Sequence, residues 1–424
     1  MLPGSIPVAE LVPELARSVG LLDAATVHGG YRVVTQDGRA LVSDAGLTMQ
    51  GVEDGGLLTV AAGVDDPPPR VYDDVVEAMA DVVERELKPW EPAAGRRTAL
   101  TAAVLLLGLG AFSLLLQRSN VAAAGACITA ALLVVGSITL SRAQHEREAA
   151  ICLAWMGAGY AAVGGLLLAP DGDLFGAPVA AAGAGAMLAG AVALVGLEQG
   201  RTLVIPAIVV GSTFAAAGLV MGAAAFRPDV VFSIFLAMIV IAGSVLPWLA
   251  LGATRTRVEQ IYSHADITSE PPPIDPEAVR EDALVGHEIL LAVSATVGAL
   301  VVLIAPLAVS RGLWGTLLAV AACVVVMLRT RQYRIGSEVL VGLVSGILGL
   351  VSTAVAVLWF HPEWQSTVAV VLAGTGAALL AGTLLPRAPS VRGGRFGDLA
   401  EIVALLSLLP LLMLSVGVIE RVRG

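Results

Sequence analysis

The chain has 424 residues, of which 57% are hydrophobic and 14% are charged, and its formal net charge is −10. Because soluble proteins average about 25% charged residues, this composition excludes an ordinary soluble protein and predicts a polytopic membrane protein. The acidic balance also argues against nucleic acid as a partner.

Residues 1–63 lack the long apolar runs of the later chain and predict a small soluble domain. Apolar residues recur at helical spacing across Pro7–Val19, and the sequence YRVVT at Tyr31–Thr35 alternates like a β-strand. A short extended piece at Leu41–Val42 and a last strand at Leu57–Ala62 follow. We therefore expect an α+β domain with the order helix, strand, short strand, strand.

Residues 64–97 predict a stiff, proline-containing linker followed by an amphipathic helix. The helix carries an apolar stripe that includes Val75, Met79, Val82 and Val83, and its other face is acidic. Anionic lipid would repel that acidic face, so we expect the stripe to bind a protein partner or to pack on the chain's own soluble domain.

Residues 98–424 predict a transmembrane domain of eleven helices, the first of which follows the pair Arg96-Arg97. A segment of about 20 apolar residues crosses the hydrocarbon layer of a bilayer, which is about 30 Å thick. The expected spans are 98–116, 121–140, 149–169, 177–197, 202–225, 229–252, 286–309, 312–328, 337–360, 364–385 and 397–419. The one long loop is 253–285, where Asp275-Pro276-Glu277 is typical of a helix start and predicts a helix that continues into the seventh span.

The arginines flanking these spans predict the orientation. Most of them lie at one set of span ends, which includes Arg96, Arg142, Arg147, Arg201 and Arg329. Because positively charged flanks stay in the cytoplasm, we expect a cytoplasmic N-terminal domain and loop 253–285, and a C-terminus outside the cell membrane.

The sequence offers few residues for chemistry. Its only lysine, Lys88, is not in a phosphate-binding loop, and its three cysteines lie in apolar runs that suggest neither a disulfide framework nor a metal site. His287, Glu288, Glu338, Asp398 and Glu401 fall in the first turns of their expected spans, and the central portions of the spans hold no such group. We therefore expect no enzyme, cofactor or metal, and a secondary transporter of a small molecule is the weaker alternative, since transporters usually keep ionisable groups at mid-membrane depth.

Small residues predict close helix packing in several spans. Gly342 and Gly346 form a GxxxG pair, and Gly374, Ala378 and Gly382 form a second row at the same spacing. The spacing does not decide whether these faces pack within one chain or between chains.

Two stretches of the N-terminal domain, LPGSIPVAELVPEL and DGRALVSDAGLTMQGVEDGGLLTV, resemble the ubiquitin-like domain of EccD, the polytopic membrane component of the actinobacterial type VII (ESX) secretion system. The eleven expected spans and the long loop after the sixth are also similar to this family. In the family a β-hairpin precedes the helix, whereas here Met1 stands directly before Leu2-Pro3, so we expect the first hairpin of this β-grasp fold to be missing.

The resemblance implies a non-enzymatic scaffold in the cell inner (plasma) membrane that supports export of WXG-type proteins. It also implies partners: the ATPase EccC, the membrane components EccB and EccE, and a second copy of the chain in a homodimer, all surrounded by membrane lipid.

Overall fold

The computed structural model describes residues 6–18, 31–35, 39–52, 56–62, 74–76, 79, 92–170, 172–224, 226–252, 276–384 and 391–418. The chain divides into two compact units, Met1–Pro92 and Ala93–Gly424, and each is described by itself.

The first unit is a small α+β domain. Helix α1 (Val8–Ser18) precedes strands β1 (Tyr31–Thr35) and β2 (Leu58–Ala62), which pair antiparallel with Val33 opposite Val60. A short 3-10 helix, η1 (Thr48–Gln50), lies between the strands in the sequence. These elements confirm the predicted helix and the two longer strands.

The core of this domain forms because the helical and strand periods bring apolar side chains to one side. Val8, Leu11 and Val12 of α1 are buried against Val33 of β1, with Leu41 and Leu47 completing the cluster. The expected short extended piece lies along the other edge of β1, where the Leu41 N–H donates to the Val33 carbonyl at 2.8 Å. Of the predicted linker helix, only residues 74–76 and 79 fall within the described residues.

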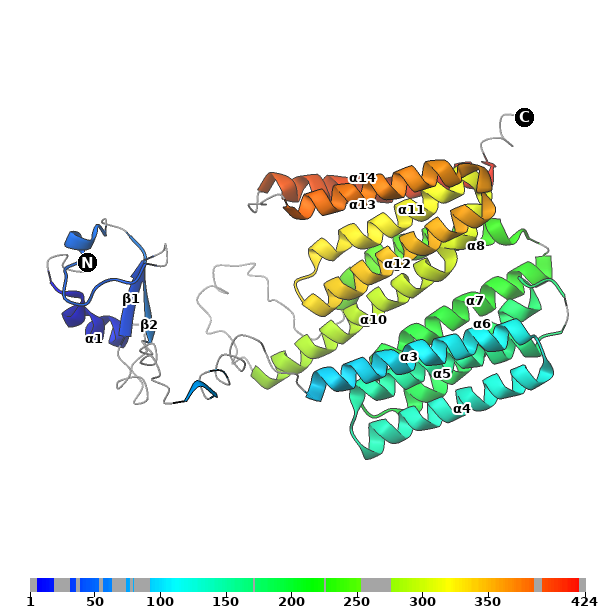
Figure 1. Cartoon of the computed structure of the whole chain (residues 1–424), viewed down its shortest axis with the longest axis horizontal. Helices are drawn as coiled ribbons and strands as arrows, with labels where there is room; N and C mark the ends of the chain where they lie inside the picture. Colours follow the sequence, from blue (N-terminus) through cyan, green and yellow to red (C-terminus); the bar gives the residue numbers. More distant parts are fainter. Residues whose placement is uncertain are drawn as a thin grey trace, which may run out of the picture. The chain divides into compact units, whose positions relative to one another are not determined.

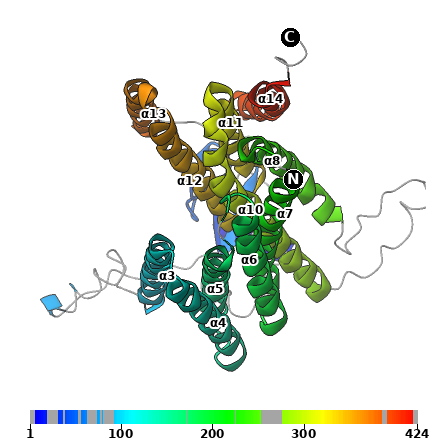
Figure 2. The same ribbon diagram turned by 90° about the vertical axis from the view of Figure 1, so that its right-hand side faces the viewer.

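The second unit is a bundle of long apolar helices (Figures 1 and 2). In chain order these are α3 (Pro92–Gln117), α4 (Asn120–Ala143), α5 (Arg147–Leu168), α6 (Ala177–Gly196), α7 (Ile205–Ala224), α8 (Pro228–Gly252), α10 (Pro276–Ala308), α11 (Gly312–Arg329), α12 (Gly336–Phe360), α13 (Gln365–Leu384) and α14 (Val391–Val416). The 3-10 turns η2 (Arg201–Val204), η3 (Val309–Arg311), η4 (Thr330–Gln332) and η5 (Pro362–Trp364) join some of them.

The eleven expected spans correspond to these eleven helices of the described part. By length and hydropathy the described residues contain ten candidate membrane spans, because one of them, Asp282–Gln332, is 51 residues long and covers most of α10 and all of α11. Within it the 3-10 turn η3 reverses the chain direction between the two helices. The chain is therefore a multi-pass membrane protein.

Helix α10 begins where its sequence predicts, at Pro276, and runs for 33 residues into the seventh span. Glu277 lies in its first turn, where a carboxylate stabilises the positive end of the helix dipole. His287 and Glu288 thus lie about three turns inside α10, at the start of the expected seventh span.

The helices pack in two groups around α10. Helices α4, α5, α6 and α7 pack in sequence order. Helices α8, α11 and α12 pack on α10, and α14 packs on α11 and α8. Helix α7 joins the two groups through its contact with α10. The largest core cluster contains Phe232 of α8, whose ring meets Phe175 and Phe214 at 5.9 and 5.8 Å between centroids. Figure 2 shows α3 and α13 at the periphery of this bundle.

Candidate functional site

The predicted partner-binding stripe is only partly described. Val75 and Met79 are both exposed, as a docking surface requires. Val82 and Val83 lie outside the described residues. The stripe therefore stays a prediction.

The GxxxG pair on α12 faces a neighbour within the same chain. A Cβ added at Gly342 would collide with the Thr330 side chain, and one at Gly346 would collide with the Met327 side chain. Both partners lie in or directly after α11, so glycine at these positions lets α12 approach α11 closely.

The second row, on α13, has a different environment. Gly374 and Ala378 are exposed and Gly382 is half-buried. No described atom lies within 4 Å of a Cβ built at Gly374. Two similar small-residue patterns thus differ in what covers them: α11 covers the first, and no described residue covers Gly374 in the second.

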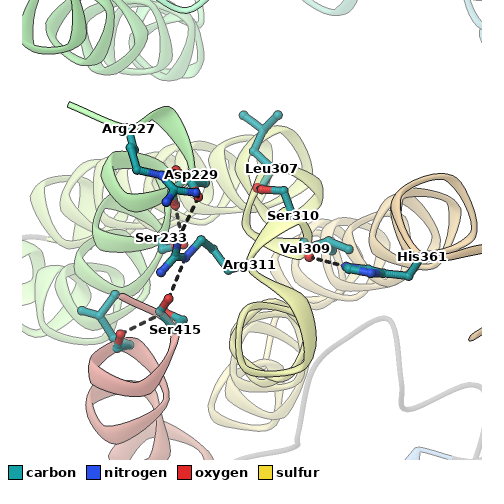
Figure 3. Close-up of polar contacts among 10 residues, drawn as sticks. Arg227, Asp229, Ser233, Leu307, Val309, Ser310, Arg311, His361 and Ser415 are labelled. Carbon is teal, nitrogen blue, oxygen red and sulfur yellow. Dashed lines mark hydrogen bonds and ion pairs between the residues drawn. The ribbon is translucent and has the colours of Figure 1, made fainter. Parts of the chain in front are cut away.

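A polar network around Arg311 connects the ends of several helices (Figure 3). Asp229 at the start of α8 accepts hydrogen bonds from Arg227 at 2.8 Å and from Arg311 at 3.0 Å. Arg311 also donates through Nε to the Ser415 carbonyl of α14 at 2.6 Å. Through these two hydrogen bonds Arg311 connects η3 to the start of α8 and to the end of α14.

His361, after α12, extends this network. Its Nε2 lies 3.1 Å from the Val309 carbonyl, and its ring stacks on Trp364 at 4.3 Å between centroids. Neither His361 nor Arg311 stands out in the sequence. His361 and its partner Val309 are 52 residues apart in the chain. Arg311 is 104 residues from Ser415 and 82 residues from Asp229. No local sequence pattern indicates contacts between residues so far apart.

A second polar network lies at the arginine-rich end, which is the end that carries Arg96, Arg142, Arg147, Arg329 and Arg331. His287 Nδ1 of α10 lies 2.7 Å from the carboxylate of Glu338, whose side chain is only 3% exposed in the first turn of α12. Arg147 of α5 pairs with Glu288 of α10 at 2.6 Å. These contacts hold α5, α10 and α12 in register.

The Ser337 hydroxyl, the His287 ring and the Glu338 carboxylate lie one after another, as the three groups of a serine-hydrolase triad do. Their distances, however, fit a structural pair of His287 and Glu338 only. Ser337 Oγ lies 3.4 Å from His287 Nε2, beyond the range of about 2.6–3.2 Å that a nucleophile and its base require. Within the described residues, no group of three or more His, Cys, Asp or Glu side chains could hold a metal ion. What the described geometry supports is helix assembly.

Each of the two units of the chain matches a known protein family model. The family model described as "EccD-like transmembrane domain" matches residues 95–424. The model described as "WXG100 protein secretion system (Wss), protein YukD" matches residues 1–60. No curated protein matches the chain.

Two solved structures share the fold. One is titled "Structure of protomer 1 of the ESX-3 core complex"; it has 21% sequence identity and a TM-score of 0.62, over 99% of this chain and 96% of that chain. The other is titled "MycP5-free ESX-5 inner membrane complex, State II"; it has 18% identity and a TM-score of 0.59, over 90% of this chain and 95% of that chain.

Proposed function

Since the chain belongs to the family of proteins with an EccD-like transmembrane domain, we propose that it is a membrane scaffold subunit of a type VII (ESX) secretion core complex. It supports export of WXG-type proteins, and an ATPase partner supplies the energy. The observation that carries this proposal is the pairing of two modules on one chain: an EccD-like domain at 95–424 and a YukD-like domain at 1–60. The titles of both similar structures, which name ESX complexes, support the same assignment.

The scaffold role is non-enzymatic. Two polar networks of the described part, around Arg311 and around Glu338, connect helix ends to one another. The alternative, a secondary transporter of a small molecule, finds no support in the comparisons.

The partners we propose are EccC, EccB and EccE, together with a second copy of the chain. The exposed residues Val75 and Met79 suit a cytoplasmic protein partner because the helix that carries them is otherwise acidic. The uncovered small residues of α13 suit the second copy, since small residues allow two helices to approach closely within a membrane.

We place the chain in the cell inner (plasma) membrane with the N-terminal domain in the cytoplasm and the C-terminus outside. The support is the arginine asymmetry, which gathers Arg96, Arg142, Arg147 and Arg331 at one end of the bundle.

Affinity purification tests the proposal. The full chain, tagged and expressed in a cell that makes its own type VII system, is solubilised in mild detergent and recovered under native conditions. We expect an assembly that retains the ATPase and the two other membrane components, and loss of WXG-type protein export when the gene is deleted. Recovery as a lone monomer from cells that still export those proteins after deletion would contradict the proposal.

A further inference from the structure

A small cavity lies between α8, α10, α11 and α12 near the arginine-rich end of the bundle. Its apolar lining is mostly valine, including Val240, Val297 and Val325, and its polar lining comes from Ser244, Ser294, Arg329 and Tyr333. Water can enter about 20 Å³ of it, which is room for one water-sized occupant. This space is slightly more than one water molecule needs, so the cavity can hold a single small occupant.

Arg329 brings a positive charge to this cavity. The residue is only 9% exposed, and its Nη2 donates to the Ser244 carbonyl at 2.8 Å, whereas its Nε has no hydrogen-bond partner. None of the cavity-lining residues is a carboxylate. Buried charges are normally paired, because leaving one unpaired sacrifices hydration without compensation.

Tyr333 supplies a second donor. Ser294 Oγ lies 3.2 Å from the Tyr333 hydroxyl oxygen, and when Ser294 is the donor the phenol hydrogen is available to another acceptor. The cavity thus combines a guanidinium N–H without an acceptor and a phenol O–H, with no negative charge among its lining residues. These two hydrogen-bond donors and the positive charge of Arg329 fit an acceptor that carries a negative charge.

We propose that the cavity binds one small monovalent anion of the halide class, with chloride as the physiological form, between Arg329 Nε and the Tyr333 hydroxyl. A water molecule would satisfy the Nε–H but would leave the charge of Arg329 uncompensated. Phosphate and other oxyanions exceed the available space. The bound halide would contact Arg329 of α11 and Tyr333 directly after η4, and these two residues bond in turn to Ser244 of α8 and Ser294 of α10.

The test measures thermal unfolding of the purified full chain in sodium chloride and in sodium gluconate at equal ionic strength. We expect a higher and saturable midpoint in chloride, reproduced by bromide, because gluconate is too large for the cavity. Arg329→Gln should abolish the difference. Arg142→Gln is the matched control: Arg142 also ends a helix and donates to a backbone carbonyl, that of Gly196, but it is exposed, so the difference should persist.

Equal midpoints in chloride and gluconate for the wild type would show that the cavity holds only water and would overturn the proposal. A difference that survives in Arg329→Gln would place the halide elsewhere and would overturn it as well. If Arg329→Gln fails to fold, Tyr333→Phe decides, since it keeps the charge and removes one donor. We expect its half-saturating chloride concentration to rise several-fold, and an unchanged value would contradict the site.

Discussion

The guanidinium of Arg311 lies 3.0 Å from the carboxylate of Asp229, although 82 residues separate them in the chain. Both side chains are largely buried, at 17% and 14% exposure. Arg227, the other partner of Asp229, is 72% exposed. One carboxylate therefore makes one buried and one exposed ion pair, and the two can be compared directly.

We expect Asp229→Asn to lower the stability of the membrane domain by about 2 kcal/mol, because it leaves the buried Arg311 charge without its carboxylate. Arg227→Gln is the control and should cost less than about 0.5 kcal/mol, as exposed ion pairs contribute little. The thermal unfolding midpoint in detergent measures both. Equal losses in the two variants would show that burial does not set the strength of this network.

A second comparison concerns two glutamates that each pair with a histidine and each begin a helical segment. Glu338 is 3% exposed beside His287, and Glu363 is 61% exposed beside His361. We expect Glu338→Ala to destabilise the fold by about 2 kcal/mol, because the histidine loses a buried partner and a void remains. Glu363→Ala should change stability by less than about 0.5 kcal/mol.

Chemical unfolding of the two variants, followed by tryptophan fluorescence in micelles, measures this difference. Glu338→Gln, which keeps the size of the side chain and one acceptor oxygen, should retain part of the stability. A Glu338→Ala protein as stable as Glu363→Ala would contradict a structural role for the buried pair.

Much of this fold could be predicted from the sequence because its signals are local. Apolar runs long enough to cross a bilayer located the helices within a few residues, and Asp275-Pro276-Glu277 located the start of α10. Which helices and side chains contact one another could not be predicted. The pairing of Asp229 with Arg311 and the burial of Arg329 depend on which helices become neighbours, and hydropathy carries no such information.

The glycine rows illustrate the same limit. Gly342 and Gly374 stand in similar small-residue patterns, yet Gly342 meets a side chain of its own chain and Gly374 meets no described atom. Spacing identifies a face that permits close approach. Only the three-dimensional arrangement identifies what approaches it.

The contact between α6 and α7 depends on glycine more strictly. A Cβ at Gly183 would lie 2.5 Å from the Gly211 carbonyl oxygen and 2.8 Å from the Phe214 carbonyl carbon, both of which are backbone atoms that no side-chain rotation can move. We expect Gly183→Ala to destabilise the domain by about 2 kcal/mol through overpacking. The thermal midpoint measures the effect. Gly108→Ala is the control, since no described atom lies within 4 Å of a Cβ at that position on α3, and alanine there should be neutral or stabilising by up to about 1 kcal/mol.

The last prediction concerns the exposed small-residue row of α13, which we propose contacts a second copy of the chain. Gly374→Leu should disrupt self-association, because a large side chain separates two helices that rely on close backbone approach. It should leave the stability of the single chain unchanged, since no described atom lies within 4 Å of the position. Light scattering of the detergent-solubilised protein, coupled to size exclusion, measures the oligomeric state.

Gly376→Leu is the matched control for this prediction. It introduces the same side chain into the same helix, also with no described atom within 4 Å, but two residues along a helix turn the side chain by about 200° to the opposite face. Only Gly374→Leu should therefore shift the protein toward the monomer. If both variants dissociate the assembly, or if neither does, the row containing Gly374 is not the contact between copies, because the effect would then not depend on the face of α13.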